Sequence, residues 1–387
     1  MLPRSRQLAE AGGQGQPKWE LSDIFRSHGE SYRRTHPLPA SHRKVMRAVE
    51  VCRTKELGGH LKKCDTCGFE HPTYNSCLDR HCPKCQSLAK AKWLKKQNSE
   101  LLPTGYFHLV FTLTHELNRL VLAHKRVLLN ILFQAVSETL LEFGRTHLRG
   151  ELGFIAVLHT WDQLLKDHFH LHCLIPAGAL SFDQSRWIAA RKDFLFRVEP
   201  LSRRFRKKFL KLLQKAIDQG KLPSPAPWLS NQDWVVYAKK PFSSPDKVLD
   251  YLGRYTHRVA ISNHRILSVE HGQVSFTYRD RKDKDRLKTK TLDAQEFIRR
   301  FLLHVLPDGF MRVRHFGFLA NRAKKRALPQ CRKLLGLNPA LPEIPKRSAQ
   351  DLLLELTGID LSRCPNCKQG TMVIVAELPK RRPWDSS

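Results

Sequence analysis

Apolar and polar residues repeat at two different spacings along this chain, and together the spacings predict an α+β protein. Three short stretches are rich in β-branched and aromatic residues and predict strands, at 106–114, 153–161 and 168–176. Between the first two, residues 118–143 repeat apolar side chains at helical spacing. A short polar loop joins the last two stretches and predicts an antiparallel hairpin. The order strand, helix, hairpin is typical of the start of a ferredoxin-like sheet.

Helical patterns and shorter strands flank this region. A helical stretch at 20–53 is interrupted near Pro37 to Pro39, and a second one at 87–102 ends at Pro103. Residues 181–230 contain a basic amphipathic helix, whose cations form either a solvated face or phosphate contacts. Capping residues and local apolar runs predict the remaining elements: a helix from Ser244 to about Val259, strands at 265–270, 273–279 and 310–318, and a basic stretch from Asn321 to Lys333.

These patterns divide the chain into four segments. Residues 1–18 form a Gly- and Gln-rich N-terminal stretch, and residues 19–102 form a small helical domain that holds most of the cysteines. Residues 103–320 form the sheet-containing domain, with a basic helical insertion at about 181–240. Residues 321–387 form a basic C-terminal tail.

Composition and charge narrow the class of protein. The chain has 387 residues with 41% hydrophobic residues, and 67 Lys and Arg against 36 Asp and Glu leave a net charge of +31. A surplus of this size indicates a polyanionic partner. The longest apolar run, 127–136, is too short for a membrane span and is interrupted by polar residues, and the N-terminus lacks the apolar stretch of a secretory signal. We therefore expect a cytoplasmic protein that handles nucleic acid and has no membrane partner.

Two Cys-x2-Cys knuckles predict a structural zinc site. Cys64 and Cys67 form the first, Cys82 and Cys85 form the second, and together they can hold one tetrahedral Zn²⁺. A disulfide framework is the alternative, but thiols stay reduced in the cytoplasm.

Other cysteines and histidines leave the ligand set open. Cys77 and His81 can replace one of the four ligands, or join Cys52 and His60 around a second ion. A third knuckle, Cys364-Pro-Asn-Cys367, is either half of a site completed elsewhere or a pair of small residues in a turn.

A group of histidines predicts a second kind of metal site. His168, His170 and His172 alternate along a predicted strand and therefore share one face. His159 lies on the preceding strand and comes alongside His170 if the two strands pair. A single histidine on an apolar face is usually a core residue, but several that converge from adjacent strands predict one divalent ion.

Tyr251 and Tyr255 lie four residues apart and would share one face of the predicted helix. Alone, this spacing is more typical of two rings that pack on a sheet. Beside a metal site the pair gains a chemical meaning. A phenol of pKa about 10 is a poor nucleophile unless its target is activated. An ion bound by the histidines can polarise a phosphodiester, and attack by a tyrosine then yields a covalent phosphotyrosine.

Together these motifs resemble the two-tyrosine transposases of the HUH endonuclease superfamily, the insertion-sequence ninety-one family, which move by a rolling-circle route. The resemblance covers nearly the whole chain. It rests on four segments in this order: Arg80-His-Cys-Pro-Lys-Cys85, Val157-Leu-His-Thr-Trp161 leading to His170-Leu-His-Cys-Leu174, Tyr251-x3-Tyr255-Thr-His-Arg258, and Arg314-His-Phe-Gly-Phe-Leu319.

The resemblance implies a fold, a cofactor and an activity. The fold is an HUH domain, a ferredoxin-like antiparallel sheet flanked by helices, preceded by a zinc-binding domain. His170 and His172 would bind Mg²⁺ or Mn²⁺, and His159 is the favoured third ligand, with His168 and Gln163 as alternatives. Tyr251 and Tyr255 would cleave single-stranded DNA and leave a 5′-phosphotyrosine and a free 3′-OH.

The same resemblance implies the partners. Single-stranded DNA at the transposon ends and at the target is the expected substrate, and the protein would be nucleoid-associated when bound to it. No G-x4-G-K-[ST] loop is present, so unwinding would come from a host helicase or replication protein. The predicted DNA contacts are Arg254, Arg258, Arg312 and Arg314. Rings and cations interleave at 310–316, as suits a single strand, although a core strand with solvated arginines is an equal alternative.

Two other classes of protein share some of these features. A non-catalytic zinc-containing nucleic-acid-binding protein accounts for the charge and the cysteines but leaves the histidines and tyrosines unexplained. A metallohydrolase of the amidohydrolase kind also has a His-x-His strand, but it needs an eight-fold βα pattern that the sequence lacks.

Overall fold

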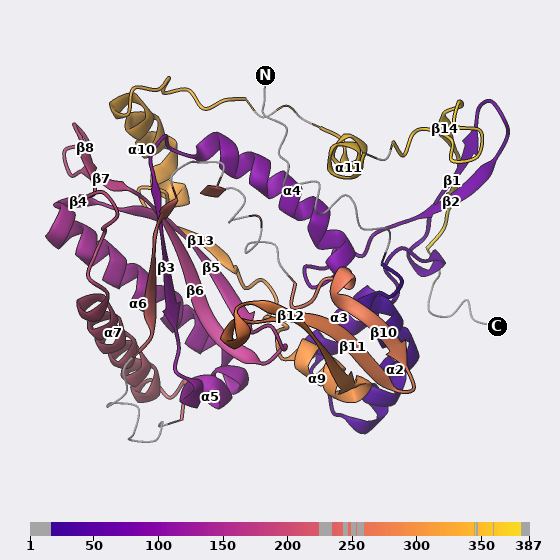
Figure 1. Cartoon of the computed structure of the whole chain (residues 1–387), viewed down its shortest axis with the longest axis horizontal. Helices are drawn as coiled ribbons and strands as arrows, with labels where there is room; N and C mark the ends of the chain where they lie inside the picture. Colours follow the sequence, from indigo (N-terminus) through magenta and orange to yellow (C-terminus); the bar gives the residue numbers. More distant parts are fainter. Residues whose placement is uncertain are drawn as a thin grey trace.

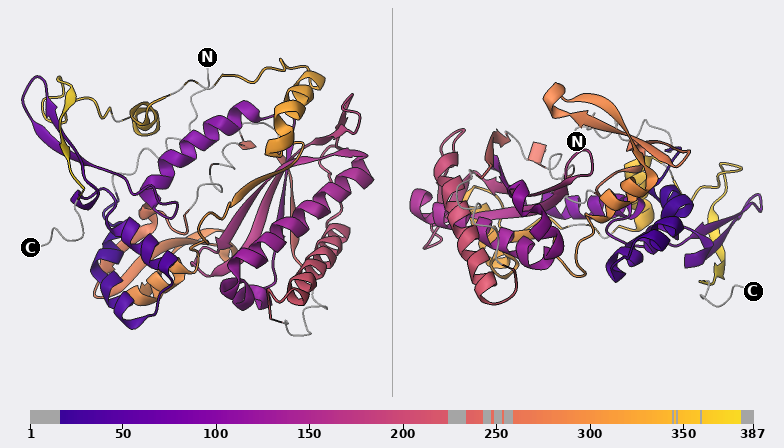
Figure 2. Two further views of the ribbon diagram at one scale, coloured as in Figure 1. Left: turned by 180° about the vertical axis from the view of Figure 1, so that it is seen from behind. Right: turned by 90° about the horizontal axis from the view of Figure 1, so that it is seen from below.

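A computed structural model describes residues 17–223, 234–242, 247–248, 253, 259–343, 345, 347–358 and 360–380 of the chain. Within these residues the protein has a large sheet-containing lobe, a smaller mixed lobe and a projecting three-stranded module (Figure 1; Figure 2). The helix α4 (Pro83–Glu100) runs between them, beginning next to the mixed lobe and ending next to the large sheet (Figure 1).

The large lobe is built on a five-stranded sheet in which every neighbouring pair is antiparallel. Its strands, in the order β13-β5-β6-β3-β9, are Val313–Gly317, Gly153–Trp161, Asp167–Pro176, Tyr106–Thr112 and Val236–Phe242. The order β9-β3-β6-β5 is the ferredoxin-like order, and β13 adds a fifth strand beside β5. The predicted α+β class and the three predicted strands around the hairpin are confirmed.

Two helices cover one face of this sheet, because its strands alternate apolar residues toward them. Helices α6 (Lys125–Phe143) and α7 (Val198–Asp218) share one buried cluster with that face. Phe111 of β3 meets Phe205 of α7 edge to face, with ring centroids 5.2 Å apart. Each such ring contributes roughly 1.5–3 kcal/mol through burial. The helix predicted within 181–230 is therefore part of the core of this lobe.

Two details of these helices depart from simple expectation. The predicted helix 118–143 is divided into α5 (Asn118–Ala123) and α6, because His124 has the non-helical angles φ −125° and ψ 44°. By length and composition the stretch Lys125–Leu148 would suit a membrane span, but 67% of its most apolar part is buried inside the protein. Its apolar character is explained by its place under the sheet.

The mixed lobe joins the N-terminal helices to a sheet from much later in the chain. Its elements are α2 (Leu21–Thr35), α3 (Ala40–Glu50), β10 (Ile266–Glu270), β11 (Gln273–Asp280), β12 (Arg286–Asp293) and α9 (Ala294–Leu302). The rings of Phe25 and Phe301 meet with centroids 5.4 Å apart. The backbone N–H of Leu21 donates to Oδ1 of Asn263 at 3.1 Å. The predicted interruption near Pro37 to Pro39 is confirmed, since α2 ends at Thr35.

The projecting structure, which we call the peripheral module, is a three-stranded sheet of order β14-β1-β2 (Figure 1). Its strands are β1 (Gly59–Cys64), β2 (Glu70–Tyr74) and β14 (Met372–Leu378). The predicted C-terminal tail therefore contains a strand that returns to the N-terminal hairpin.

The remaining elements complete the described residues. They are η1 (Lys55–Leu57), η2 (His115–Leu117), η3 (Gly144–Leu148), β4 (Gly150–Glu151), β7 (Gly178–Ser181), β8 (Trp187–Ala189), η5 (Asn263–Arg265), η6 (Arg281–Asp283), α10 (Asn321–Leu334) and α11 (Ala349–Thr357). The predicted strand at 310–318 is shorter than expected, and the predicted helix from Ser244 to Val259 falls almost wholly outside the described residues.

A candidate active site and two cysteine clusters

The histidines gather on the face of the large sheet that α6 and α7 leave uncovered. Strands β5 and β6 pair with His159 opposite His170, as predicted from a hairpin. Phe169, Leu171 and Cys173 point toward the helices and belong to their apolar cluster. Because side chains alternate along a strand, the histidines of β6 must occupy the opposite face.

Three of these histidines can share one ion. The ligand nitrogens of His159, His170 and His172 all lie within 4.8 Å of one another, and the three side chains are 5%, 8% and 8% exposed. Nitrogens bound to one divalent ion at about 2.1 Å lie on the order of 3–4 Å apart, so small side-chain adjustments suffice. His168, one of the alternative third ligands, lies outside this group, and its ring stacks on His115. Gln163, the other alternative, stays a prediction; its backbone oxygen accepts a hydrogen bond from Arg265.

Two hydrogen bonds fix how the rings face. Nδ1 of His170 lies 3.0 Å from the backbone oxygen of His168, so it donates and leaves Nε2 as the acceptor atom. Nδ1 of His172 lies 2.9 Å from Nε2 of His108 on β3, which likewise directs Nε2 of His172 to the group. Partners of this kind hold metal-binding imidazoles in position. His108 is absent from the predicted site, although the alternation of 106–112 puts it on this face.

Burial keeps these imidazoles neutral. It lowers the pKa of His170 and of His172 well below the usual value, and the neighbouring His159 lowers both further. Burial also lowers the pKa of His108 to about 3. Neutral imidazole is the form that binds metals, so the group fits a divalent ion. A set of nitrogen donors without a carboxylate suits Mn²⁺ better than Mg²⁺, which prefers oxygen.

The predicted nucleophiles, Tyr251 and Tyr255, lie outside the described residues, as do Arg254 and Arg258. The described residues nearest to them approach the histidine face. Val248 is fully buried beside Tyr106 and Leu174, which belong to that face. A β-carbon on Gly253 would lie 3.2 Å from Leu94 of α4. After the gap, Val259 lines a small pocket together with Thr160, Trp161 and His304.

The other two predicted DNA contacts are engaged within the protein. Arg312 donates to Oε1 of Gln86 at 3.1 Å, and burial lowers its pKa to about 10. Arg314 lies over the ring of Phe133, 4.0 Å from its centroid, and donates to Asn130 at 2.6 Å. Contact of these two residues with DNA stays a prediction.

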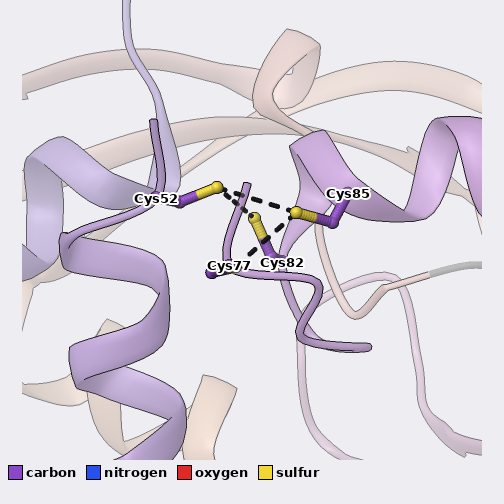
Figure 3. Close-up of side chains that lie close together, drawn as sticks. All are labelled: Cys52, Cys77, Cys82 and Cys85. Atoms are coloured by element: carbon purple, nitrogen blue, oxygen red, sulfur yellow. Dashed lines mark hydrogen bonds between the residues drawn. The ribbon is translucent and has the colours of Figure 1, made fainter. Parts of the chain in front are cut away.

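Four cysteines meet at the start of α4, in a group that we call the core cluster (Figure 3). Its sulfur atoms belong to Cys52, Cys77, Cys82 and Cys85. The Sγ of Cys52 is 3.6 Å from that of Cys85 and 3.7 Å from that of Cys82, and Cys77 is 3.6 Å from Cys85. For Zn–S bonds of about 2.3 Å, tetrahedral ligands lie about 3.8 Å apart.

A second group, the peripheral cluster, lies in the peripheral module and consists of Cys64, Cys67, Cys364 and Cys367. The prediction that Cys64 and Cys67 share one site with Cys82 and Cys85 is therefore wrong. The hairpin β1–β2 carries the first knuckle away from the second, while Cys52 and Cys77 lie at the base of that hairpin.

The remaining cysteine and histidine predictions divide in the same way. Cys77 joins the core cluster, as one alternative held. His81 does not, because its Nδ1 contacts Asp79 at 2.9 Å and its Nε2 accepts from the N–H of Leu306 at 3.4 Å. Of the two alternatives for Cys364 and Cys367, half of a site completed elsewhere is the one that the geometry supports.

Comparisons with known proteins match two transposase families to different parts of the chain. The family described as "Transposase zinc-binding domain" matches residues 24–113, and the family described as "Putative transposase" matches residues 153–327. The chain is 47% identical over 394 residues to "Putative transposase y4qJ" of Sinorhizobium fredii, covering 95% of this chain and 98% of that protein. It is 30% identical over 335 residues to "Transposase for insertion sequence element IS801" of Pseudomonas savastanoi pv. phaseolicola, covering 82% and 79%. No solved structure matches significantly.

Proposed function

Because the chain belongs to the insertion-sequence ninety-one family of transposases with an N-terminal zinc-binding domain, we propose that it nicks and rejoins single-stranded DNA at insertion-sequence ends. One observation carries this proposal: three buried imidazoles converge on the sheet face opposite α6 and α7. Val248, which precedes the predicted tyrosines, packs beside Tyr106 and Leu174 of that face.

His159, His170 and His172 would hold one divalent ion. A bound Mn²⁺ or Mg²⁺ would polarise a non-bridging oxygen of the scissile phosphate and offset the charge that develops there. The protein's own contribution is to orient these rings and, by burial, to favour the neutral form of His170 and His172. His108 acts as a positioning residue, since it touches His172 at 2.9 Å and is not itself one of the three.

Tyr251 or Tyr255 would supply the nucleophile. The phenol oxygen attacks phosphorus and loses its proton, while the bond from phosphorus to the 3′-oxygen breaks and that oxygen takes up a proton. The products are a 5′-phosphotyrosine and a free 3′-OH. The phosphodiester energy is retained, so a DNA 3′-OH can reverse the step without ATP. Two tyrosines would let the protein hold one strand end while it cleaves a second.

The net charge of +31 supports a DNA substrate, because cations on the protein release counterions from the phosphate backbone. We further propose that the protein acts in the cytoplasm at the nucleoid and that a host helicase or replication protein exposes the single strand.

A cleavage assay tests the proposal. Labelled single-stranded oligonucleotides from both element ends are incubated with Mn²⁺ or Mg²⁺, and covalent adducts are separated under denaturing conditions. We expect an adduct with the unaltered protein, more with Mn²⁺ than with Mg²⁺. It should be absent from Tyr251→Phe/Tyr255→Phe and from His170→Ala/His172→Ala. Tyr237→Phe, which changes an exposed tyrosine of β9, is the matched control and should retain full activity.

One further variant separates positioning from ligation. His108→Phe leaves the three proposed ligands in place and should raise the Mn²⁺ concentration needed for half-maximal cleavage by roughly 10- to 100-fold. Strong DNA binding without any adduct, in zinc-loaded folded protein, would instead support the non-catalytic DNA-binding alternative.

A further inference from the structure

We propose that Cys64, Cys67, Cys364 and Cys367 bind a second structural zinc ion, which fastens the C-terminal strand β14 to the N-terminal hairpin β1–β2. The matching zinc-binding family spans only residues 24–113 and so includes two of these four residues. The two halves of the site lie 303 positions apart in sequence, as measured between Cys64 and Cys367. This inference is independent of the proposed DNA chemistry.

The sulfur geometry fits one tetrahedral ion. The Sγ atoms of Cys64 and Cys367 are 3.7 Å apart, as are those of Cys67 and Cys364, and all four lie within 4.8 Å of one another. Tetrahedral thiolates around zinc lie about 3.8 Å apart. A disulfide needs about 2.05 Å, and none of the ten cysteines, all of which are described, forms one.

The two knuckles adopt the same turn although their sequences are unrelated outside the cysteines. In the hairpin knuckle the N–H of Gly68 donates to the backbone oxygen of Cys64 at 3.1 Å. In the C-terminal knuckle the N–H of Lys368 donates to the backbone oxygen of Cys364, also at 3.1 Å. Gly68 and Lys368 both have positive φ, +73° and +60°. For lysine this conformation is unfavourable, so the surrounding contacts must maintain it.

Backbone N–H groups point at the sulfur atoms in both knuckles. The N–H of Cys67 lies 3.4 Å from Sγ of Cys64, and the N–H of Gly370 lies 3.3 Å from Sγ of Cys367. Hydrogen bonds of this kind stabilise thiolate, which is the form that binds zinc. In each of the two segments, one sulfur atom therefore accepts a backbone hydrogen bond, and both segments direct their sulfur atoms to the same point.

The contact between the knuckles is specified closely by the sequence. A β-carbon on Gly370 would lie 2.4 Å from Sγ of Cys64, so only glycine fits there. Asp65 accepts a hydrogen bond at 2.8 Å from the N–H of Thr371, and its own N–H donates to the oxygen of Thr371 at 3.1 Å. Beyond this point β14 pairs with β1 along the whole length of β1.

The peripheral module has too little apolar core to hold this arrangement alone. Its buried apolar residues are Cys64, Cys364 and Met372, with Phe69 and Cys367 packed against them. Val373, Ile374 and Val375 of β14 are 45%, 58% and 49% exposed. Units below about 40 residues usually need a metal or disulfides to fold, and this one has no disulfide. A zinc ion would supply most of its stability.

Zinc content of the purified full-length chain, measured by mass spectrometry of the metal, tests the proposal. We expect two zinc ions per chain in the unaltered protein and one in Cys364→Ser/Cys367→Ser. Cys331→Ser, which changes a buried cysteine of α10 outside both clusters, is the matched control and should retain two. In the double variant, alkylation of the unchanged Cys67 should rise strongly, because its exposed sulfur would no longer be bound.

A second pair of variants distinguishes loss of a zinc ligand from misfolding of the chain. Cys367→His keeps a zinc ligand and should retain two ions, whereas Cys367→Ser should lose one. A zinc content that Cys364→Ser/Cys367→Ser leaves unchanged would overturn the proposal, as would one iron ion in place of the second zinc. DNA cleavage is not part of this measurement, so its result stands whether or not the proposed transesterification is correct.

Discussion

The two cysteine clusters each offer four thiols, but in very different surroundings. Cys52 and Cys82 belong to the large apolar cluster of the mixed lobe, together with residues of α2, α3, α9 and the β10–β12 sheet. In the peripheral cluster, Cys64, Cys364 and Cys367 share a small cluster with only Met372 and Phe69, and Cys67 is exposed. An ion in the core cluster adds to a fold that many other contacts stabilise, whereas the peripheral module depends on its ion.

The clusters also differ in how they connect to the candidate active site. Cys82 precedes the first residue of α4, and Cys85 lies in its first turn. Further along, Trp93 and Leu94 of α4 pack on the buried cluster of Tyr106, Leu174 and Val248 on the histidine face. By holding the first turn of α4, the core cluster therefore helps to fix the position of α4 over that face. Helix α11, which precedes the C-terminal knuckle in the sequence, contacts α4 where Glu355 pairs with Lys95.

The largest effect should come from removing the core cluster. We expect Cys82→Ser/Cys85→Ser to lower the free energy of unfolding of the main transition by on the order of 3–5 kcal/mol and to abolish DNA cleavage. Cys364→Ser/Cys367→Ser should change the same transition by less than about 0.5 kcal/mol. Thermal unfolding followed by circular dichroism measures both. Equal shifts in the two variants would show that the clusters do not differ in this way.

An intermediate effect should appear with pH, through the buried His304, which contacts Thr160 and Leu165. Burial lowers the pKa of His304 to about 4, below the unfolded value of about 6.5. As the pH falls, His304 therefore becomes protonated in the unfolded chain before it does so in the folded chain. Its contribution to stability is complete above pH about 6.5 and is lost as the pH falls toward 4. Between pH 7 and pH 5 the expected loss is roughly 2 kcal/mol.

Urea unfolding at both pH values measures this loss, and His304→Gln supplies the control. Glutamine does not titrate and can still donate to the oxygen of Leu165, which His304 contacts at 3.1 Å. The pH dependence of the main transition should become shallower in this variant. The substitution should leave zinc retention by the peripheral module unchanged. An unchanged pH dependence would mean that His304 does not contribute.

The smallest effect should come from the ion pair between α4 and α11. Glu355 pairs with Lys95 and with Arg347, the latter at 2.9 Å, and its side chain is 48% exposed. Exposed pairs contribute less than about 1 kcal/mol, so Glu355→Gln should raise the rate of limited proteolysis between α10 and α11 by less than about fivefold. Glu343→Gln, at an exposed position in the same segment, is the control. A lower free energy of unfolding for the main transition in Glu355→Gln would contradict the separation of the two regions.

Local spacing made part of this protein predictable. Strand alternation over residues 168–172 and the short loop before it were enough to bring His159 beside His170, because hairpin neighbours pair in a register set by the turn. Cys-x2-Cys spacing identified thiols that can grip one ion. The same spacing cannot tell which knuckle completes which site, so Cys52, Cys77 and the C-terminal knuckle were assigned only as alternatives.

Contacts between distant segments could not be predicted from the sequence. His108 supports His172 only because β3 pairs with β6, a choice made by the packing of the whole sheet. The docking of Leu21 and Phe25 on Phe301 likewise depends on the completed fold. Strand β12 was missed for a different reason. It is an edge strand whose only buried residue is Leu292, so it lacks the apolar alternation that marks a half-buried strand.

The sequence separation of the cysteines within each cluster also determines when that cluster can close during translation. Cys52 and Cys85 lie 33 positions apart, so the core cluster can close within seconds of leaving the ribosome at about 5–20 residues per second. The hairpin emerges early too, but Cys367 follows Cys64 by 303 positions, roughly 15–60 s later. The peripheral module can therefore close only after Cys364 and Cys367 have been synthesised. A product that stops before Cys364 retains a hairpin with two unmatched thiols, open to oxidation and to cellular proteases.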